Sequence, residues 1–315
     1  MNWNANWNEG SNPYAGVSSP QKGFPSVLPL NEATDWIEGV GPAGLVLGVD
    51  SLGEPITVDL DDESPHILVS APTGRGKSAI ARSVACQRLA RGDVIVILDI
   101  KRHSHRWAQQ LAPNVVYAKS VQEIGKTLVN LGRELHRRNH VVDDTPFDQP
   151  ITDAPVGPRI IVIFEEMNAT MKSLTALGKQ RLSDGDYTAN QGLEDVSFMG
   201  RAVRMHLVSF AQLATYRASG GSEVVENYGT RILVGHSPQA WQYLARDCGK
   251  PLTAPSEHGR GIVCQGGKAR ETQLLWVPEQ SAVPFVTAAV PAQRTARKLC
   301  QRSRVPEVWR QAIGR

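Results

Sequence analysis

The stretch from His66 to Ser78, HILVSAPTGRGKS, decides the fold of this chain. Its apolar first half predicts a buried strand, and the rest follows the phosphate-binding loop pattern G-x-x-x-x-G-K-[ST], except that Ala71 stands at the first position in place of glycine. The following residues, up to Gly92, have apolar side chains at helical spacing. This context supports the match, because a strand followed by a helix N-terminus presents backbone N–H groups to phosphate.

The loop therefore predicts an ATP site. Lys77 would reach the β- and γ-phosphates, and the Ser78 hydroxyl would bind Mg²⁺. Ala71 falls at the hinge between strand and loop, where a small residue with negative φ suffices, so we do not expect the substitution to disable the site. The expected nucleotide-binding residues are Pro72, Thr73, Gly74, Arg75, Gly76, Lys77, Ser78 and Ala79.

Further short apolar runs along the chain predict buried strands, separated by segments of helical periodicity. DVIVILDI, RIIVIF and MHLVSFAQ are typical of buried parallel strands, and residues 120–138 begin with a Ser120–Glu123 capping box. Together with the phosphate loop, this alternation predicts an α/β fold, a P-loop NTPase with a mainly parallel central sheet and helices on both faces.

Hydrolysis needs carboxylates at the end of a neighbouring strand, and RIIVIF is followed by Glu165 and Glu166. We expect Glu165 to join the Mg²⁺ shell and Glu166 to polarise the attacking water. A solvated acidic pair is the alternative. Gln212 ends another strand, where a polar side chain can contact the γ-phosphate; an ordinary exposed glutamine is the alternative there.

Composition limits the remaining possibilities. The four cysteines form no C-x-x-C pair, which disfavours a zinc site or a disulfide framework, and the net charge is only +3. We find no signal-peptide pattern and no apolar run near the ~20 residues of a membrane span. The expected location is cytoplasmic, or peripheral at a membrane through a partner.

Three regions are expected along the chain. Residues 1–33 read as a flexible leader, either solvated or docked through its tryptophans, and residues 34–285 as the ATPase domain. Residues 286–315 read as a basic tail, with seven Lys or Arg against one acid between residues 292 and 315. That tail would bind DNA phosphates, or else serve as a solubilising segment or a subunit contact.

In this order, the segments resemble the motor domain of the FtsK/SpoIIIE family of DNA translocases. The resemblance covers about residues 43–278 and includes LVLGVDSLGEPITVDL, VIVILDIKR with Asp99 and Lys101, GRAVRMHLVSFAQL, GTRILVGHSPQAWQYLARDCG and GRGIVC. The form FEEMNAT looks most like the branch of actinobacterial conjugative plasmids and integrative elements. The membrane helices and winged-helix domain of larger members have no expected counterpart here.

The resemblance implies an ATP-dependent double-stranded DNA translocase for conjugative, mobile-element, plasmid or chromosome DNA. It also implies a RecA-like P-loop NTPase fold and a hexameric ring with ATP sites between subunits. A separate membrane or pore protein would be a further partner. Such a site uses an arginine finger, for which Arg201 and Arg231 fall on family-like segments. Two alternatives remain: a nucleotide-binding scaffold without hydrolysis, and a related DNA-packaging or helicase ring ATPase.

Overall fold

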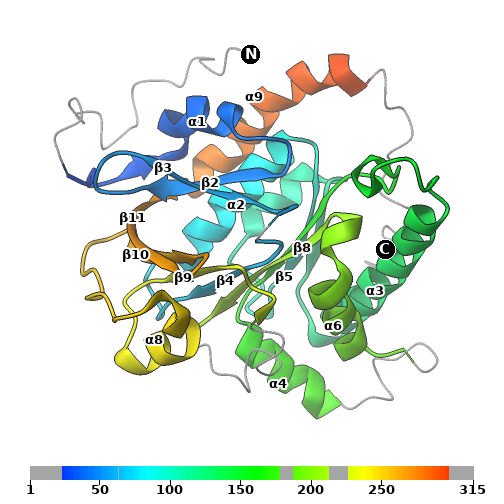
Figure 1. The fold of residues 1–315 in the computed structure, drawn as a ribbon. Helices are drawn as coiled ribbons and strands as arrows, with labels where there is room; N and C mark the ends of the chain where they lie inside the picture. The colour runs from blue at the N-terminus through cyan, green and yellow to red at the C-terminus, as the bar shows by residue number, and fades with distance from the viewer. Residues whose placement is uncertain (1–22, 63, 178–186, 213–225, 298–315) are drawn as a thin grey trace.

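One large sheet organises the chain (Figure 1). The structure, a computed structural model, describes residues 23–62, 64–177, 187–212 and 226–297, with side chains as far as residue 288. In this part of the chain the strand order is β3-β2-β11-β10-β9-β4-β8-β7-β5-β6, and β1 pairs with β11 outside that path. The strands are β1 (Leu28–Pro29), β2 (Gly44–Val49), β3 (Pro55–Asp59), β4 (Ile67–Ser70), β5 (Val94–Leu98), β6 (Val115–Ala118), β7 (Ile160–Phe164), β8 (Met205–Ala211), β9 (Thr230–Leu233), β10 (Arg260–Gln265) and β11 (Lys268–Trp276).

The sheet has a parallel half and an antiparallel half. Strands β9, β4, β8, β7, β5 and β6 pair in parallel, whereas β10, β11, β2 and β3 are joined by antiparallel pairs. The predicted α/β fold with a mainly parallel sheet is therefore confirmed. Because the ends of parallel strands meet at one edge of a sheet, the loops after β4, β8, β7 and β5 lie along the same edge, where ligands bind in such folds.

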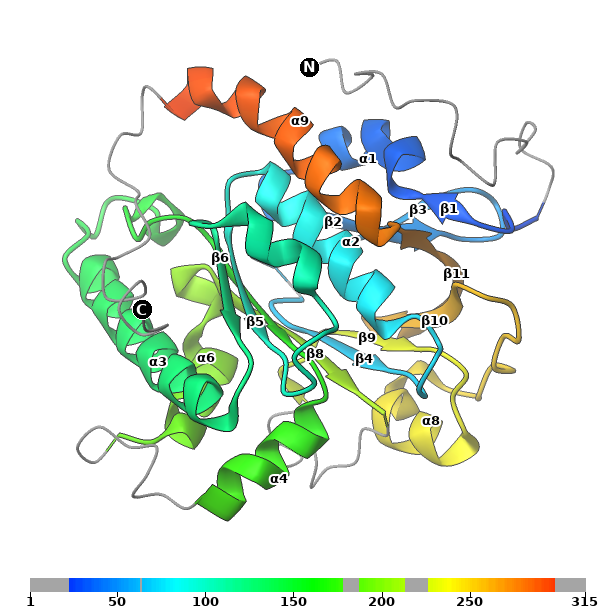
Figure 2. The same ribbon diagram turned by 180° about the vertical axis from the view of Figure 1, so that it is seen from behind.

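Helices cover both faces of the sheet (Figures 1 and 2). On one face α2 (Lys77–Ala90) and α9 (Glu279–Arg297) pack with Ile67 and Val69, and on the other α3 (Val121–Asp143), α6 (Ala189–Met199) and α8 (Pro238–Leu244) pack with Leu68. This alternation along β4 follows from the two-residue period of a strand. The other helices are α1 (Thr34–Gly39), α4 (Met167–Leu177), η2 (Leu30–Ala33), η3 (Arg106–Leu111), η4 (Ile151–Asp153), η5 (Arg201–Val203) and η6 (Arg246–Cys248).

Local sequence signals set the limits of α3 and the spacing of its neighbour. The expected capping box is present: the Ser120 side chain accepts from Glu123 N, and the Glu123 side chain accepts from Ser120 N. Helix α6 crosses α3 closely at Gly192, where an added Cβ would lie 2.1 Å from Leu128 O. The pair can approach this far only because Gly192 has no side chain.

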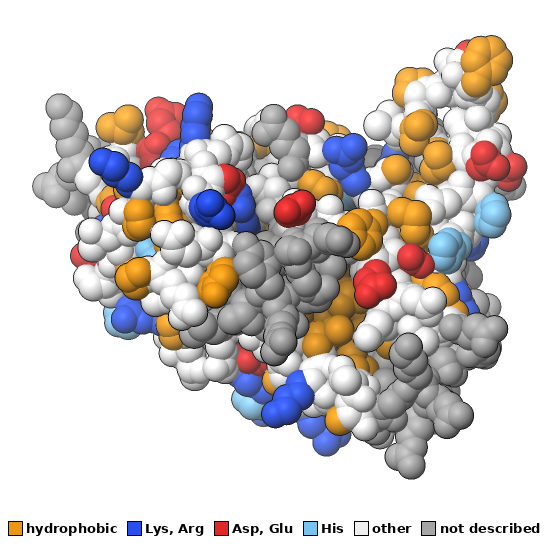
Figure 3. Space-filling model, turned by 60° about the horizontal axis from the view of Figure 1, so that its bottom comes forward, with side chains coloured by type: hydrophobic (Ala, Val, Ile, Leu, Met, Phe, Trp, Pro, Cys, Tyr) orange, Lys and Arg blue, Asp and Glu red, His pale blue; other side chains and the backbone are white. Residues whose placement is uncertain are grey.

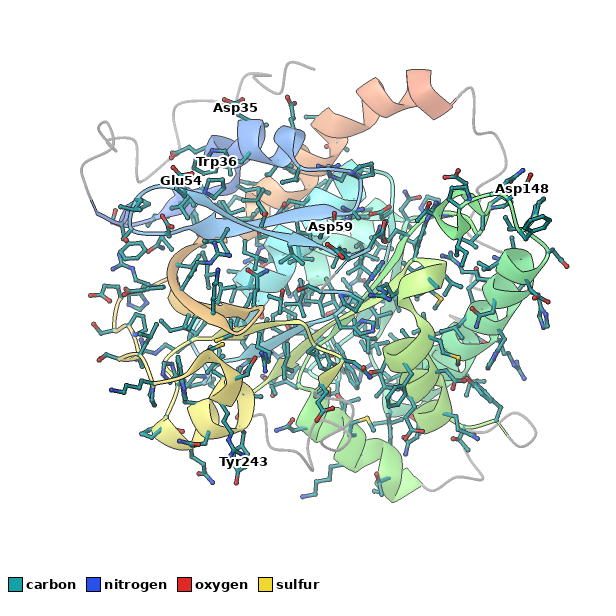
Figure 4. The ribbon with its side chains drawn as sticks, in the orientation of Figure 1. Asp35, Trp36, Glu54, Asp59, Asp148 and Tyr243 are labelled. Atoms are coloured by element: carbon teal, nitrogen blue, oxygen red, sulfur yellow. The ribbon has the colours of Figure 1, made fainter. Side chains whose placement is uncertain are left out.

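A polar cluster joins the amino ends of β7 and β8 to the turn after β3, with Arg159 and His206 buried and Asp61 exposed. After Asp59, which is labelled in Figure 4, the chain turns through a hydrogen bond from Asp61 N to Asp59 Oδ1 (2.8 Å). The Asp61 carboxylate accepts hydrogen bonds from both terminal nitrogens of Arg159, at 2.6 and 2.7 Å. Arg159 also contacts the ring of His206 at the start of β8. These contacts fix the sheet edge opposite the loops that follow β4 and β7.

The predicted region boundaries need correction at both ends. Strand β1 pairs with β11, and Leu28, Leu30 and Ala33 are buried, so the last part of the expected leader belongs to the core. The expected boundary at residue 285 falls inside α9, whose Phe285 and Val286 are also buried. Apolar packing against the sheet and α2 draws both segments into the domain. Trp3, Trp7 and residues 298–315 lie outside the described residues.

Candidate nucleotide site

The loop between β4 and α2 has the backbone of a phosphate cradle. Gly74 and Gly76 have φ of +79° and +86°, and a Cβ added at either would meet nothing within 4 Å, so the space above the loop is open. Ala71 is not among the described residues with positive φ, and it is buried, with its N donating to Ala211 O at 3.0 Å. The expectation that alanine fits this hinge agrees with this backbone.

Lys77 lies folded back over its own loop. Its Nζ donates to Ala71 O (2.9 Å) and Pro72 O (3.3 Å), and its side chain is only 7% exposed. Burial lowers the pKa of Lys77 from its usual value, and the negative charge of Glu166 partly offsets this effect. Lys77 can exchange these two loop carbonyls for phosphate oxygens when a nucleotide binds. Ser78 follows it in the first turn of α2.

Glu165 and Glu166 follow β7, which is separated from β4 in the sheet by β8. Both carboxylates are buried, and Glu166 Oε1 lies 3.7 Å from Lys77 Nζ. Glu166 has a φ of +47°, a left-handed conformation that is rare for a residue with a side chain. Such backbone strain is concentrated at functional sites. The structure thus brings Lys77 and Glu166 together, as their predicted roles require.

Two further side chains reach this cluster from the loop after β5. Lys101 Nζ lies 2.6 Å from Glu166 Oε1, and His105 Nε2 lies 2.8 Å from Glu165 Oε1. His105 is not among the expected site residues; it lies with Lys101 in the segment 101–107, shortly after the end of β5. Its strand-end position is the one sequence signal for these contacts. The pairing of β5 with β7 then brings both residues to the glutamates.

Asp99 holds this loop in shape. It is buried and accepts from Lys101 N (3.0 Å), Ser104 N (2.9 Å) and the Tyr117 hydroxyl (2.6 Å). Burial raises the pKa of Tyr117, and the hydrogen bond to Asp99 adds to the rise, so Tyr117 remains a donor. The resemblance pointed to Asp99 and Lys101. In the structure Asp99 holds the loop after β5 through hydrogen bonds, and Lys101 contacts the carboxylate of Glu166.

The remaining predicted residues lie at different places in the fold. Gln212 is exposed directly after β8, at the same sheet edge as Lys77. Arg201 is exposed in η5, before β8, at the opposite edge, and donates to Asp62 O at 3.3 Å. Arg231 lies on β9, and its guanidinium pairs with Asp247. Neither arginine reaches the cluster in its own chain, and their roles stay predictions.

A cavity of about 190 Å³ opens beside the loop. The sequence does not predict this cavity, because its lining residues come from segments that are far apart in the chain. It is lined by Gly74, Arg75, Gly76, Ala79, Ile80, Val234, Glu257, His258, Gly259, Leu274, Leu275 and Trp276. Its mixture of apolar and polar walls next to a phosphate cradle suits the nucleoside part of a nucleotide.

The residues present also fit a magnesium ion. Mg²⁺ usually binds one or two protein oxygens together with phosphates and water. Ser78 and Glu165 supply such oxygens, from a helix start and a strand end at one sheet edge. Within the described ranges, no group of three or more His, Cys, Asp or Glu could hold a metal ion.

Basic, acidic and hydrophobic side chains are interspersed on the face seen in Figure 3. The strongest basic run of the sequence, Arg294–Arg315, lies almost entirely outside the described residues, and its contact with DNA stays a prediction. No helix of the described part is long and apolar enough to span a membrane.

Solved structures share this architecture. The conjugation coupling protein TcpA of pCW3, solved with ATPγS, aligns with a TM-score of 0.68 and 18% identity over 84% of this chain and 75% of that one. The fold is that of a P-loop ATPase. The type VII secretion ATPase EccC of Thermomonospora curvata aligns with a TM-score of 0.60 and 16% identity, over 79% of this chain and 31% of that chain.

EssC (ATPases 2 and 3) from Geobacillus thermodenitrificans aligns with a TM-score of 0.59 and 12% identity, over 90% of this chain and 53% of that chain. The chain thus corresponds to about three quarters of the TcpA chain and to a smaller share of the two secretion ATPases. No protein-family model matches the chain, and no curated protein matches it significantly. The expected resemblance to FtsK-type ATPases is confirmed at the level of the fold.

Proposed function

We propose that this chain hydrolyses ATP and uses the free energy to translocate double-stranded DNA in conjugative or mobile-element transfer. One observation carries the proposal: Lys77, Lys101 and Glu166 meet at the carboxyl edge of a parallel sheet, beside Glu165. A phosphate-binding lysine, a candidate metal ligand and a candidate base are the groups that phosphoryl transfer needs. The fold likeness to a conjugation coupling protein supports DNA as the cargo.

In the proposed reaction, Lys77 leaves the carbonyls of Ala71 and Pro72 and binds the β- and γ-phosphates. Ser78 and Glu165 would hold Mg²⁺, which would supply charge neutralisation at the phosphates. Water attacks the γ-phosphorus while Glu166 accepts its proton, and the bond between the γ-phosphorus and the bridging oxygen breaks to release ADP and phosphate. Gln212 contacts the γ-phosphate and responds to its loss. The nucleoside occupies the cavity between Ile80 and Trp276.

We further propose a hexameric ring that encloses the DNA, with a membrane or pore protein as partner. Arg201 lies at the sheet edge opposite Lys77, so as an arginine finger it would act at the ATP site of a neighbouring subunit. A catalytic arginine supplied in trans stabilises the charge of the transition state.

The test is ATP turnover by the purified chain with and without linear double-stranded DNA. Lys77→Ala and Glu166→Gln should abolish turnover, while Lys268→Ala and Glu194→Gln, at exposed positions on β11 and α6, should leave it unchanged. Stimulation by duplex DNA but not by single strands supports the translocase. ATP binding without turnover would leave the scaffold alternative, and stimulation by single strands alone would favour a helicase.

The trans arginine has its own test. Lys77→Ala chains retain Arg201, and Arg201→Ala chains retain Lys77. If the site forms between subunits, a mixture of the two inactive variants recovers part of the wild-type turnover. Full activity of Arg201→Ala alone would remove this residue from the site, and the same mixture with Arg231→Ala then tests the second candidate.

A further inference from the structure

A buried histidine holds one of the two glutamates of the candidate site. His105 Nε2 lies 2.8 Å from Glu165 Oε1, and both side chains are almost fully buried, at 0% and 2% exposure. A carboxylate oxygen at this distance accepts a hydrogen bond, so Nε2 carries the hydrogen. No partner for His105 Nδ1 occurs within the described residues. Among the described residues, the imidazole of His105 therefore makes its polar contact with Glu165 alone.

The ring of His105 is fixed from its own loop. Its backbone N donates to the Tyr117 hydroxyl (3.3 Å), which in turn donates to Asp99, and its carbonyl accepts from Ala108 N at the start of η3. The indole of Trp107 stands edge-on to the imidazole, with ring centres 6.5 Å apart and planes at 74°. The donor is thus held in place before any ligand arrives.

Glu165 needs such a support more than an aspartate would. Its side chain has one more rotatable bond, and a long side chain loses more rotamer freedom when it is fixed. Carboxylates that hold metals are commonly oriented by hydrogen bonds from neighbouring groups. With Oε1 engaged by His105, the other oxygen, Oε2, is the one that would bind the metal ion.

The geometry points to His105 as a positioning residue that fixes the Glu165 carboxylate for Mg²⁺. This inference rests on the proposed function, because it assumes that Glu165 belongs to the Mg²⁺ shell. His105 acts through Glu165 and touches neither nucleotide nor metal. It follows that the β5 loop, through Asp99 and Tyr117, belongs to the metal site as well as to the fold.

The experiment measures equilibrium binding of ATPγS to the full chain at graded free Mg²⁺ and in excess chelator. His105→Leu removes the donor and keeps similar bulk. His105→Gln places an amide N–H near the position of Nε2, and His105→Asn is too short to reach Glu165. We expect Leu and Asn to raise the Mg²⁺ concentration for half-maximal effect by about tenfold or more. His105→Gln should bring this Mg²⁺ concentration back toward the wild-type value. ATPγS binding without Mg²⁺ should be equal in all variants.

A double-substitution series sharpens the assignment. Glu165→Asp draws the carboxylate back from His105, so adding His105→Leu to Glu165→Asp should change the Mg²⁺ requirement little. An unchanged Mg²⁺ requirement in His105→Leu overturns the inference, as does an equal loss of binding with and without Mg²⁺, which marks general damage to the fold. If the wild-type chain binds no ATPγS at all, the proposed function itself fails.

Discussion

Lys101 Nζ lies 2.6 Å from Glu166 Oε1, closer than Lys77 Nζ, which approaches the same oxygen at 3.7 Å. The two lysines come from different loops and share one buried carboxylate. Lys101 is the more exposed, at 38% of its side chain against 7% for Lys77. Glu166 is thus held between a lysine that faces the phosphate loop and one that faces solvent.

Substitution of Lys101 by Met should lower turnover. The ammonium fixes the orientation of Glu166 and adds positive charge where phosphate charge develops, so we expect kcat to fall by about tenfold or more with little change in KM. Lys101→Arg, which keeps the charge, should retain more activity. Steady-state kinetics measure both, and an unchanged kcat in Lys101→Met would show that the contact has no part in catalysis.

Restoring the usual glycine with Ala71→Gly should not improve the site. Ala71 is buried and does not need positive φ, so glycine adds only freedom in the unfolded chain and costs about 0.4–1 kcal/mol of stability. Urea unfolding and ATPγS binding measure the two effects. A clear gain in affinity would mean that alanine does impair the loop.

Filling the cavity should separate base binding from phosphate binding. Ile80 lines the cavity, and Ile80→Trp would occupy the space next to the loop. We expect ATP affinity to fall about tenfold, equivalent to about 1.4 kcal/mol. Competition by inorganic tripolyphosphate should be unaffected, since it needs only the cradle. Equal losses for ATP and tripolyphosphate would place the nucleoside elsewhere.

Acid should destabilise the fold through His66. Burial lowers the pKa of His66 from 6.5 to about 4, and the neutral ring accepts from Leu207 N through Nδ1. Between pH 6.5 and about 4, His66 is protonated in the unfolded state but neutral in the folded state. The free energy of unfolding therefore has its full value above this window and falls as the pH drops through it. The loss amounts to at most about 3 kcal/mol.

Urea unfolding from pH 7 to pH 4 measures this loss. His66→Asn keeps an acceptor near Leu207 N but does not titrate, so its stability should depend less on pH than that of the wild-type chain. Burial also lowers the pKa of His206, which adds a slope of the same sign in both proteins. Parallel curves for the two proteins would contradict the assignment to His66.

Gly192→Ala should loosen the α3–α6 pair. The new Cβ would lie 2.1 Å from Leu128 O, so the helices must separate, at a cost of about 1–3 kcal/mol. Gly39→Ala is the matched control, because a Cβ there meets nothing within 4 Å. Thermal unfolding of the two variants compares them, and equal stability would show that the interface adjusts freely.

The local elements and the phosphate cradle follow from residues that are close together in the sequence. The strand, loop and helix around Lys77 follow from apolar periodicity and from two glycines in left-handed conformation, and the α3 capping box follows from Ser120 and Glu123. These features depend on neighbours along the chain. The glutamates after β7 could also be predicted as partners of the loop, because the carboxyl ends of parallel strands lie at one edge of a sheet.

The contacts between side chains of different strands depend on the order of the strands in the sheet. Lys101 and His105 reach Glu166 and Glu165 because β5 pairs with β7, and no local pattern encodes that neighbour. The cavity joins Ile80 to Trp276, and the burial of Leu28 and Phe285 moved both predicted boundaries. Strand order and long-range apolar packing are set by the whole chain, since each surface is buried by segments distant in sequence.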